Sequence, residues 1–542
     1  MSAIANFPTR ARTSPPVYRW ARWVVASGLA IFTSFSHAVT FEVSTADEFQ
    51  AALATAASNG ADDEIRLGEG VYLGNFKFIP EESNSLKITG AGKEKTIIDG
   101  GDRAFAFFLS AKSQKPSLVM ENLSIRNRSL AEGALFRMTG NQDGPFGWSA
   151  NEAPQIKIID ADLQSASGAV AVFPNAGDIV LERVHLTKGG ISCEYCGVIV
   201  RSSTLKAPEG DIAVGGLSAI DSDIEVRAFD SSVFKGGTIP TGIVISNSKL
   251  QASNISSNNR NFDIHRSTIS TSIFNLRATD NDDTTNYFVG NQVHGRCFFS
   301  GCGDLDVQLG GQNSFATMIV TNNLISSITG ASLSVNDYGV LNFFSNTVIG
   351  SVFLRPLTNG AKHEVINNII SRDGPDEALI VIGFAESAIL KNNILSAESD
   401  SVWDVSVSNF VSNPVFADVD NGDYHLSSES VGINSGSNET VNDEGSTDLD
   451  GNPRILDGTI DIGAYERNTA PLHPADTNGD SSISSDEFNA YNAAWRANDI
   501  WPTAPAVITA DFVTRAGYLL QKGGDYKNIG VGKPQTWVPV NE

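Results

Sequence analysis

Oxygen-bearing side chains recur at alternate positions in a twelve-residue run near the end of the chain. Hard carboxylate, amide and hydroxyl oxygens at this spacing wrap one Ca²⁺ ion, and the glutamate at the twelfth position binds it with both oxygens. The sixth position, where such loops normally carry glycine for a sharp turn, is Ser481. The run predicts a calcium site made by Asp476, Asn478, Asp480, Ser482 and Glu487.

A second group of acids lies in the middle of the chain. Asp280, Asp282 and Asp283 occur within four residues, and Arg277 stands shortly before them. Carboxylates clustered in a surface loop could hold Ca²⁺ or act as acid and base in sugar hydrolysis. A solvated turn rich in Asp and Asn explains the same residues without chemistry. The sequence therefore assigns no catalytic residue, and it does not bring together the further basic candidates Lys235, Arg260 and Arg266.

The cysteines occur as two close pairs, Cys193 with Cys196 and Cys297 with Cys302. An even number of cysteines in an exported protein indicates disulfides. In the repeat described next, the two pairs lie about five strand steps apart, or ~24 Å at ~4.8 Å per step. Because a disulfide spans only about 7 Å between Cα atoms, each pair is expected to close locally. The same distance excludes a joint four-cysteine zinc site.

The elements that must position these groups follow from a phrase that recurs from about Val119 to Leu395. It consists of alternating apolar residues, then Asn, Ser or another small residue, then an apolar residue two places on. The phrase ends in a pair of residues, the second of which is apolar. The residue directly before this pair is here called the mark, and successive marks are 19 to 38 residues apart. This spacing, with period-two alternation inside each unit, indicates a coil of short strands. The marks are Leu123, Ala161, Val184, Ser203, Ser222, Ser248, Ser267, Asn291, Asn323, Asn346, Asn368 and Asn393.

We therefore predict an all-β protein in which residues 39–412 form a right-handed single-stranded parallel β-helix. Each strand is too short to bury its own face, so every coil must stack on the one before it. The recurring Asn are expected to form an amide ladder along a turn, and we prefer this structural role to catalysis for Asn322, Asn367 and Asn392. The two longest spacings, 38 and 32 residues, hide an extra coil or carry loops.

A short amphipathic helix is expected before the first coil. Thr45 and Glu48 have the spacing of a capping box, and Gly60 supplies a stop. The helix would cover the open end of the coil, which otherwise exposes core residues and an unpaired strand edge. Its apolar face consists of Phe49, Ala52, Leu53 and Ala56.

Residues 1–38 have the pattern of an export signal. Four arginines precede an apolar run from Val24 to Phe35, and small residues surround a plausible cleavage point at Ala38. The apolar run is too short to span a bilayer, and no later segment qualifies. Without these residues, 34 basic residues face 62 acidic ones, a formal charge of −28. This charge argues against nucleic acid or anionic lipid as a partner.

From residue 413 the composition changes to an ordered series of Gly, Asp and Pro turns. The series is Asn413-Pro414-Val415-Phe416, Gly422 to Leu426, Gly432 to Gly436, Asp448 to Arg454 and Asp461 to Glu466. Its order resembles the choice-of-anchor Q domain, a terminal piece of many secreted bacterial β-helix proteins. The resemblance covers residues 413–466 and implies a β-helix body of the pectate-lyase-like superfamily, closed at its far end by this segment. It carries over no catalytic residues.

Residues 467–542 comprise a linker and the calcium run, which continues as a helical pattern to Ala497. A second helix is expected from Thr509 to about Gln521, before Gly523 and Gly524. A calcium loop followed by a single helix resembles half of a dockerin, although no second calcium loop is visible in the sequence. The resemblance implies Ca²⁺ as the cofactor and a cohesin-like or cell-surface partner.

Two function classes fit these features, and both involve contact with an extracellular polysaccharide. One is an exported polysaccharide lyase or glycoside hydrolase, although the Gly-His-Gly and Arg-Ile-Lys signatures of the polygalacturonase family are absent from the sequence. The other is a non-catalytic, adhesive surface rod. An enzyme is expected to gather a basic residue and at least two acids in one cleft, near residues 126–155 or 277–290. A rod is expected to present a long polar or aromatic stripe without such convergence.

Overall fold

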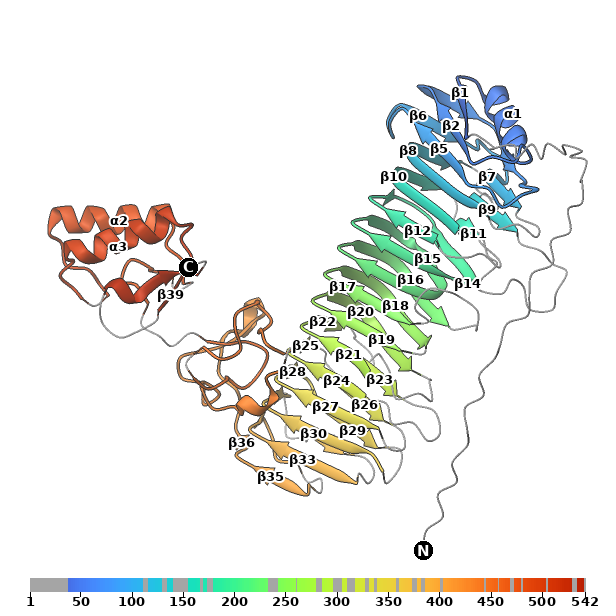
Figure 1. Cartoon of the computed structure of the whole chain (residues 1–542). Coiled ribbons are helices and arrows are strands. Elements are labelled where there is room, and N and C mark those ends of the chain that lie inside the picture. Colours follow the sequence, from blue (N-terminus) through green and yellow to red (C-terminus); the bar gives the residue numbers. More distant parts are fainter. Residues whose placement is uncertain are drawn as a thin grey trace, which may run out of the picture. The chain divides into compact units, whose positions relative to one another are not determined.

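Strands dominate the protein, whose structure is a computed structural model (Figure 1). Most of the described residues belong to one hydrogen-bonded network of 36 strands, in which every pair is parallel. The structure describes residues 38–110, 116–128, 134–139, 155–165, 169–172, 179–232, 242–259, 261–278, 285–295, 305–309, 317–326, 331–335, 339–356, 360–372, 378–381, 386–399, 403–442, 445–456, 458–467, 472–478, 481–503, 505–528 and 534–540.

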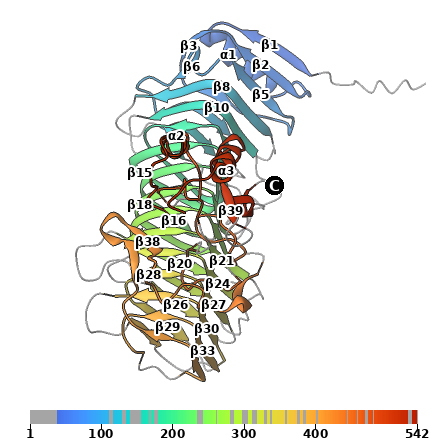
Figure 2. The same cartoon turned by 90° about the vertical axis from the view of Figure 1, so that its left-hand side faces the viewer.

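Three columns of strands run along this network, because each strand pairs with the equivalent strand of the next repeat (Figures 1 and 2). The first column contains β1 (Val39–Val43), β2 (Asp63–Leu67), β5 (Leu86–Gly90), the first halves of β8 (Ser117–Asn127) and β10 (Gln155–Ser165), β12 (Ile179–Glu182), the ends of β14 (Gly190–Arg201) and β15 (Thr204–Ile220), β17 (Ile243–Ser246), β19 (Phe262–His265), β21 (Thr285–Val289), β24 (Thr317–Thr321), β27 (Val340–Phe344), β30 (Lys362–Ile366), β33 (Ser387–Lys391) and β35 (Val405–Val407).

The second and third columns follow the same rule. The second contains β3 (Gly70–Leu73), β6 (Thr96–Asp99), the second halves of β8 and β10, β13 (His185–Leu186), the start of β15, the first halves of β16 (Asp223–Ser232), β18 (Lys249–Asn259) and β20 (Thr268–Ala278), β22 (Gln292–Gly295), β25 (Leu324–Ser326), β28 (Thr347–Ile349), β31 (Ile369–Ser371), β34 (Ile394–Leu395) and β36 (Phe410–Val411). The third contains β4 (Phe76–Phe78), β7 (Phe105–Ser110), β9 (Ala134–Thr139), β11 (Ala169–Val172), the start of β14, the middle of β15, the second halves of β16, β18 and β20, β23 (Leu305–Leu309), β26 (Ala331–Val335), β29 (Val352–Pro356) and β32 (Leu379–Val381).

The predicted ladder of marks is confirmed at the bend between the first and second columns. The Asn323 N–H donates to Asn346 Oδ1 (3.0 Å), the Asn346 N–H to Asn368 Oδ1 (2.9 Å), and the Asn368 N–H to Asn393 Oδ1 (2.8 Å). The ladder continues to Asn409, a residue that the sequence pattern did not mark. Towards the N-terminus, serine hydroxyls replace the amides: Ser203, Ser222, Ser248 and Ser267 each accept the backbone N–H of the preceding mark.

Neither of the two long spacings hides an extra repeat. Leu123 is in direct register with Ala161 across the 38-residue spacing. Across the 32-residue spacing, the Asn291 N–H donates to Asn323 Oδ1 at 2.8 Å. The marks on either side of each spacing therefore belong to neighbouring repeats.

The residue before each mark makes the bend itself, with a positive φ. Twelve non-glycine residues from Asn122 to Ser408 have φ between 47° and 61°, and Gly290 (φ 64°) takes the position in one repeat. Asn and Asp tolerate this left-handed conformation because their short side chains bond locally. Arg183 and Arg266 have no such advantage, and their side chains are exposed at the bend.

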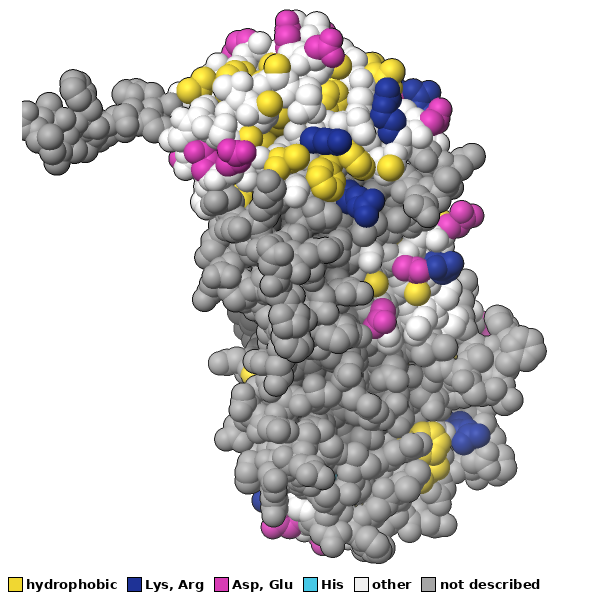
Figure 3. All heavy atoms as spheres, turned by 90° about the vertical axis from the view of Figure 1, so that its right-hand side faces the viewer, with side chains coloured by type: hydrophobic (Ala, Val, Ile, Leu, Met, Phe, Trp, Pro, Cys, Tyr) yellow, Lys and Arg dark blue, Asp and Glu magenta, His cyan; other side chains and the backbone are white. Residues whose placement is uncertain are grey.

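Alternate residues of the strands point inwards and form a continuous apolar core. In β24 and β27, for example, Met318, Val320, Leu341 and Phe343 are buried and the residues between them are less so. This core cluster extends from Val43 to Leu395, as the period-two alternation predicts. On the outside, Figure 3 shows basic, acidic and hydrophobic side chains interspersed over the N-terminal end.

The predicted N-terminal helix is α1 (Ala46–Ala56), and both hydrogen bonds of its capping box are present. The helix buries its four predicted apolar residues, and the Phe49 ring lies 6.0 Å from that of Tyr72 and 4.5 Å from that of Phe76. It therefore packs on the strands of the first repeat, as expected for a helix that covers its open end.

Residues 413–466, here called the flank segment, contain β37 (Phe416–Asp418), the 3₁₀-helices η1 (Val419–Asn421) and η2 (Asn438–Thr440), and β38 (Asp423–Leu426). Three Asn of the bend hold this segment through their side-chain N–H groups. Asn322 donates to Thr447 O (2.7 Å), Asn367 to Ser437 O (2.9 Å) and Asn392 to Ser435 O (2.9 Å). The segment was expected to close the far end, but these bonds instead place it along the side of several repeats. Asn322, Asn367 and Asn392 thus have a structural role, but they anchor this segment beside the ladder and are not members of the ladder as expected.

The C-terminal module has its own small core around Ile483, Tyr491, Leu519 and Trp537. Both predicted helices are present, as α2 (Ser485–Ala497) and α3 (Ala510–Gln521), and Thr509 is the N-cap of α3. They pack with β39 (Tyr526–Asn528), η3 (Pro534–Thr536) and β40 (Trp537–Pro539). None of the three described α-helices is long and apolar enough to cross a bilayer.

Candidate functional site

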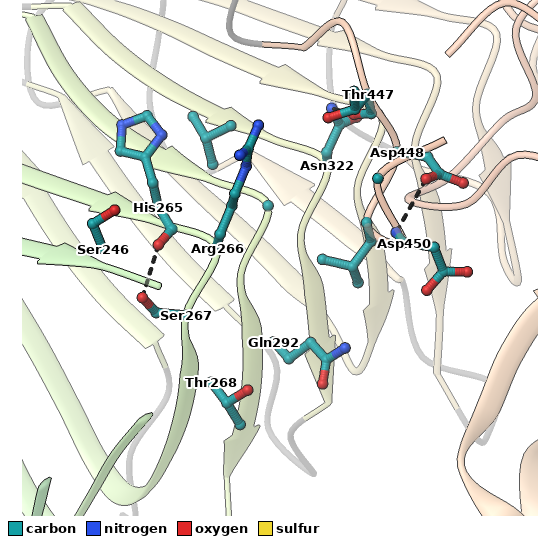
Figure 4. Close-up of a pocket in the computed structure, with 14 residues that line it drawn as sticks. Ser246, His265, Arg266, Ser267, Thr268, Gln292, Asn322, Thr447, Asp448 and Asp450 are labelled. Carbon is teal, nitrogen blue, oxygen red and sulfur yellow. Dashed lines mark hydrogen bonds between the residues drawn. The ribbon is translucent and has the colours of Figure 1, made fainter. Parts of the chain in front are cut away.

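A polar pocket of about 720 Å³ lies between the bend and the flank segment (Figure 4). One wall is formed by residues of the bend and the adjoining strands, including His265, Arg266 and Gln292. The other is the turn 447–451 of the flank segment. The bond from Asn322 to Thr447 O joins residues 125 positions apart in the sequence. The two walls of the pocket therefore meet only in the folded chain.

Arg266 contributes a guanidinium to the strand-side wall. Its backbone is fixed in the bend, with φ 47° and an N–H that donates to Val289 O at 3.0 Å. The left-handed conformation turns the side chain outwards, and in Figure 4 it stands between His265 and Asn322. Among the described residues, no carboxylate pairs with this guanidinium, whereas Arg183 at an equivalent bend is paired with Asp160. Arg266 is therefore available to a bound anion or hydroxyl.

Asp448 shapes the opposite wall. Its Oδ1 accepts the N–H groups of Asp450 (3.1 Å) and Asn452 (2.7 Å), and its Oδ2 accepts the Glu466 N–H at 2.9 Å. The carboxylate is buried, and burial raises its pKa despite these hydrogen bonds. Asp448 thus maintains the turn and has little capacity left for a ligand.

Asp450 is the more exposed acid of the pocket, and it is bonded to His425. Asp450 Oδ2 lies 2.6 Å from His425 Nε2, and Asp423 Oδ1 lies 2.6 Å from His425 Nδ1. The bond to Asp450 is the main reason that the pKa of His425 rises to about 9, with Asp423 acting in the same direction against the effect of burial. His425 is therefore an imidazolium at neutral pH, and it offsets part of the negative charge on this wall.

The described residues of the pocket can form many hydrogen bonds but include no free pair of carboxylates. Its remaining polar groups include Ser246, Ser267, Thr268 and Gln292. Hydrolysis of a glycosidic bond needs one carboxylic acid and a second carboxylate on either side of that bond, whereas both acids here already have partners. The arrangement suits the recognition of a polyhydroxylated ligand, with Arg266 as a contact for a negative group.

The calcium run ends in the first turn of α2. Asp476 Oδ2 accepts the Ser481 N–H (2.9 Å) and the Tyr526 hydroxyl (2.7 Å). Ser481 has φ 60°, so the sixth position of the run adopts the conformation for which such loops use glycine. For serine this left-handed conformation costs roughly 1–2 kcal/mol. Asp480 lies outside the described residues.

Glu487 points back into this loop. Its Oε1 accepts the N–H groups of Thr477 (2.9 Å) and Asn478 (3.3 Å), and its Oε2 accepts the N–H and hydroxyl of Ser484. Burial opposes ionisation, but these hydrogen bonds outweigh it and lower the pKa to about 2. Glu487 is thus a carboxylate at neutral pH. Within the described part of the chain, no three His, Cys, Asp or Glu side chains gather into a metal-binding group.

The remaining predicted site residues are not brought together by the described structure. Cys193 and Cys196 belong to β14, but their side chains, like the whole of Cys297 and Cys302, lie outside the description. The strand pairs from Cys193 in β14 through β15, β16, β18 and β20 to β23 span five steps, and the local disulfides stay a prediction. Also outside are Lys235, Arg260, the Arg277 side chain, Asp280, Asp282 and Asp283.

The sequence pointed to Arg266, and the range 277–290 given for the cleft overlaps this pocket at Val289 and Gly290. The pocket also gathers one basic residue, Arg266, with two acids, Asp448 and Asp450, which is the convergence expected of an enzyme. In the sequence, residues 447–451 belong to a turn-rich motif. Nothing in that motif indicates that they lie against the bend between the first and second columns. A regular left-handed bend that carries an arginine is the feature that could have drawn attention to Arg266.

A scan against protein-family models finds no matching family, and a search of curated proteins finds no relative. The fold and the pocket therefore define only a class: a strand-rich, all-β repeat protein of parallel strands with a polar pocket at its bend.

Proposed function

We propose that this chain is an exported bacterial protein, built on a right-handed parallel β-helix, that binds an extracellular polysaccharide and carries Ca²⁺ in its C-terminal module. Three features support the β-helix assignment: three parallel columns, a bend with one left-handed residue per repeat, and the ladder beside it. Connections between parallel strands of one sheet are right-handed in about 98% of cases. The order of turns in residues 413–466 supports the kinship with choice-of-anchor Q proteins of the pectate-lyase-like superfamily.

The observation that carries the glycan assignment is the Arg266 guanidinium, which pairs with no carboxylate among the described residues, in a pocket lined by hydroxyl and amide groups. A sugar residue offers hydroxyls to such groups, and a uronate also offers a carboxylate, which a guanidinium can bind through two parallel hydrogen bonds. Fixed backbone on both walls reduces the ordering cost of binding. The pocket therefore suits one acidic sugar residue of a longer chain.

Binding is favoured over hydrolytic cleavage because Asp448 and Asp450 both already have hydrogen-bond partners. Asp448 accepts three backbone N–H groups and Asp450 is bonded to His425. A cleaving enzyme would need to release one of them. The proposed role is therefore that of a glycan-binding rod. A lyase or hydrolase is the alternative that the following test must exclude, because Arg266, Asp448 and Asp450 converge in this pocket.

Replacing Arg266 with glutamine is expected to weaken the binding of polygalacturonate about 10- to 100-fold. Hydrogen bonds to charged groups contribute about 1.5–3 kcal/mol, and 1.4 kcal/mol is tenfold in affinity. Titration calorimetry with size-defined oligogalacturonates measures the effect. Arg183→Gln is the matched control, since Arg183 has the same bend conformation but is paired with Asp160 outside the pocket.

Equal loss of affinity in the two variants, or no binding of uronate polymers by the wild-type protein, would contradict this assignment. The same samples are assayed for unsaturated or reducing sugar ends. Their appearance with the wild-type protein, and their loss with Arg266→Gln, would establish the enzyme in place of the binding rod.

The calcium part of the proposal is supported by the spacing of the run and by the ionised Glu487. Added Ca²⁺ is expected to raise the melting temperature of the C-terminal module, because an ion that binds only the folded state stabilises it by mass action. Glu487→Gln keeps the side chain's size but removes its charge, and should abolish most of that rise. The measurement is the melting temperature with Ca²⁺ and with a chelator.

Ser481→Gly should act in the opposite direction. Glycine relieves the left-handed strain at φ 60°, with an expected gain of about 1 kcal/mol and tighter apparent Ca²⁺ binding. Ser481→Ala removes the hydroxyl but keeps the strain, so it should show no such gain. A calcium response that survives Glu487→Gln unchanged would refute this site.

Export and attachment complete the proposal. Residues 1–38 have the pattern of an export signal, which supports a secreted or cell-surface location. The likeness of the C-terminal module to half of a dockerin supports a cohesin-like partner on the cell surface. Ile500 and Val507, 83% and 68% exposed, are available to such a partner in the described structure.

A further inference from the structure

A second pocket, of about 250 Å³, lies where the second-column strands end in three successive repeats. The register pairs Arg126 with Gln164. In the repeat that follows β10, the Thr187 N–H donates to Leu163 O at 3.1 Å. This bond places Lys188 of that repeat beside Ser165 at the end of β10. The residues lining this pocket are Arg126, Asn127, Arg128, Gln164, Ser165 and Lys188.

One buried carboxylate holds two of the three basic side chains. Asp99 is fully buried, and its Oδ2 accepts hydrogen bonds from Arg126 Nε (2.7 Å) and Arg128 Nη2 (2.8 Å). Burial would raise the Asp99 pKa, but the bonds from Arg128, Gly101 and Arg126 outweigh it and lower that pKa. Asp99 therefore remains ionised and fixes both guanidinium groups at the edge of the pocket.

Within the part of the chain that the structure describes, these bonds leave most of the donors of the two guanidinium groups available. Each group has five N–H donors, and the bonds to Asp99 use one of each. The Arg126 and Arg128 side chains remain 34% and 64% exposed. Lys188 is exposed and has no ion pair within the described part of the chain. Asp102 is near enough to raise the pKa of Arg128, so it is the further acid that moderates this charge.

The lining thus carries three positive charges, with the buried Asp99 and the nearby Asp102 as their described counter-charges, on a chain whose net charge is −24. A concentration of cations against the overall charge is an electrostatic feature that attracts anions locally. Guanidinium groups bind planar or tetrahedral oxyanions through paired N–H groups, and Lys188 offers a third point of contact.

We propose that this cluster is a second ligand site, which takes the carboxylate or sulfate group of an acidic polysaccharide. The identity of the polymer rests on the proposed function, whereas the oxyanion site stands on its own residues. Because its residues come from three repeats, the site follows the axis of the strand network, and a polymer lying along that axis would meet it. Nucleic acid is disfavoured by the net charge of the chain.

The test uses the full chain with three probes: polygalacturonate, dextran sulfate and neutral dextran. The Arg128→Gln, Lys188→Gln double variant is expected to bind at least one acidic polymer 30-fold or more weakly than the wild type. Neutral dextran should show no difference. Loss confined to polygalacturonate identifies a carboxylate ligand, and loss confined to dextran sulfate identifies a sulfate ligand.

Lys206→Gln is the matched control, because Lys206 is an exposed lysine of the same column in the next repeat and lies outside the pocket. Lys188→Gln alone should weaken binding about fivefold, and it removes no bond of Asp99. Unchanged affinity of the folded double variant for both acidic polymers would overturn the second site. If Arg266→Gln abolishes binding while the double variant does not, only the second site fails. If the wild type binds neither acidic polymer, both proposals fail.

Discussion

Replacing Arg454 with methionine is expected to destabilise the flank segment by about 3–5 kcal/mol, since removing one partner of a buried ion pair leaves an uncompensated charge. The Arg454 side chain is fully buried, with Nη1 3.2 Å from Glu466 Oε1. Its Nη2 also donates to Asp461 O (3.1 Å) and Gly463 O (3.0 Å). Limited proteolysis should then cut within residues 413–466 at temperatures where the wild type resists.

The pH dependence of this loss distinguishes a buried charge from a simple packing defect. Burial raises the pKa of Glu466 above its usual range, and the Arg454 guanidinium limits that rise. A carboxyl whose folded pKa is raised is most stabilising below its unfolded pKa, and that stability is lost as the pH rises through the folded pKa. Without Arg454 the folded pKa rises further, so the variant should be far less stable at pH 8 than at pH 5.

The matched control adds Glu466→Gln to Arg454→Met. This double variant contains no buried carboxylate at position 466, so most of the pH-dependent loss should disappear. Because the flank segment supplies one wall of the first pocket, Arg454→Met should also weaken glycan binding. If Arg454→Met is as stable as the wild type at pH 8, the ion pair does not hold this segment.

Replacing His363 with leucine is expected to stabilise the strand network by about 1–3 kcal/mol at neutral pH. The ring is fully buried in the core, and neither ring nitrogen has a hydrogen-bond partner among the described residues. A buried polar group without a partner costs about 1–3 kcal/mol. Leucine has a similar volume and suits a site that is in register with Leu341 in one neighbouring repeat and Ala388 in the other. Calorimetric unfolding of the two proteins measures the gain.

Acid should increase the difference between wild type and His363→Leu. Burial lowers the pKa of His363 from 6.5 to about 4. A group whose folded pKa is depressed loses stability as the pH falls from its unfolded towards its folded pKa, here from 6.5 to 4. Since one pKa unit corresponds to 1.36 kcal/mol, the wild type should lose up to about 3 kcal/mol over that range relative to the leucine variant.

His473 provides the contrasting control, because its ring is equally buried but fully bonded. Nδ1 accepts the Ala475 N–H at 3.1 Å, and Nε2 lies 3.1 Å from Phe512 O. His473→Leu removes both bonds and should destabilise the C-terminal module, although burial lowers the pKa of His473 to about 4 as well. A gain of stability in His473→Leu, or a loss in His363→Leu at pH 7, would contradict the role assigned to the hydrogen bonds.

Most of the architecture of the strand network could be predicted from the repeat pattern of the sequence. The marks from Val184 to Asn393 predicted which residues stack, because each repeat must bury its apolar face against the next and the polar residue at the bend must bond to its neighbour. The capping box of α1 and the two helices of the C-terminal module could also be predicted from the sequence, because they depend on bonds between residues a few positions apart.

Both pockets depended on the tertiary structure. Arg266 and Asp450 are far apart in the sequence, and nothing in their local surroundings indicates that the flank segment lies along the side of the repeats. Likewise, nothing in the sequence links Arg126, Gln164 and Lys188, which only the strand register aligns. Periodicity specifies which residues face inwards, because burial repeats along the chain. The meeting of outward-facing residues is set by the register of separate repeats and by a docked segment, which no local pattern encodes.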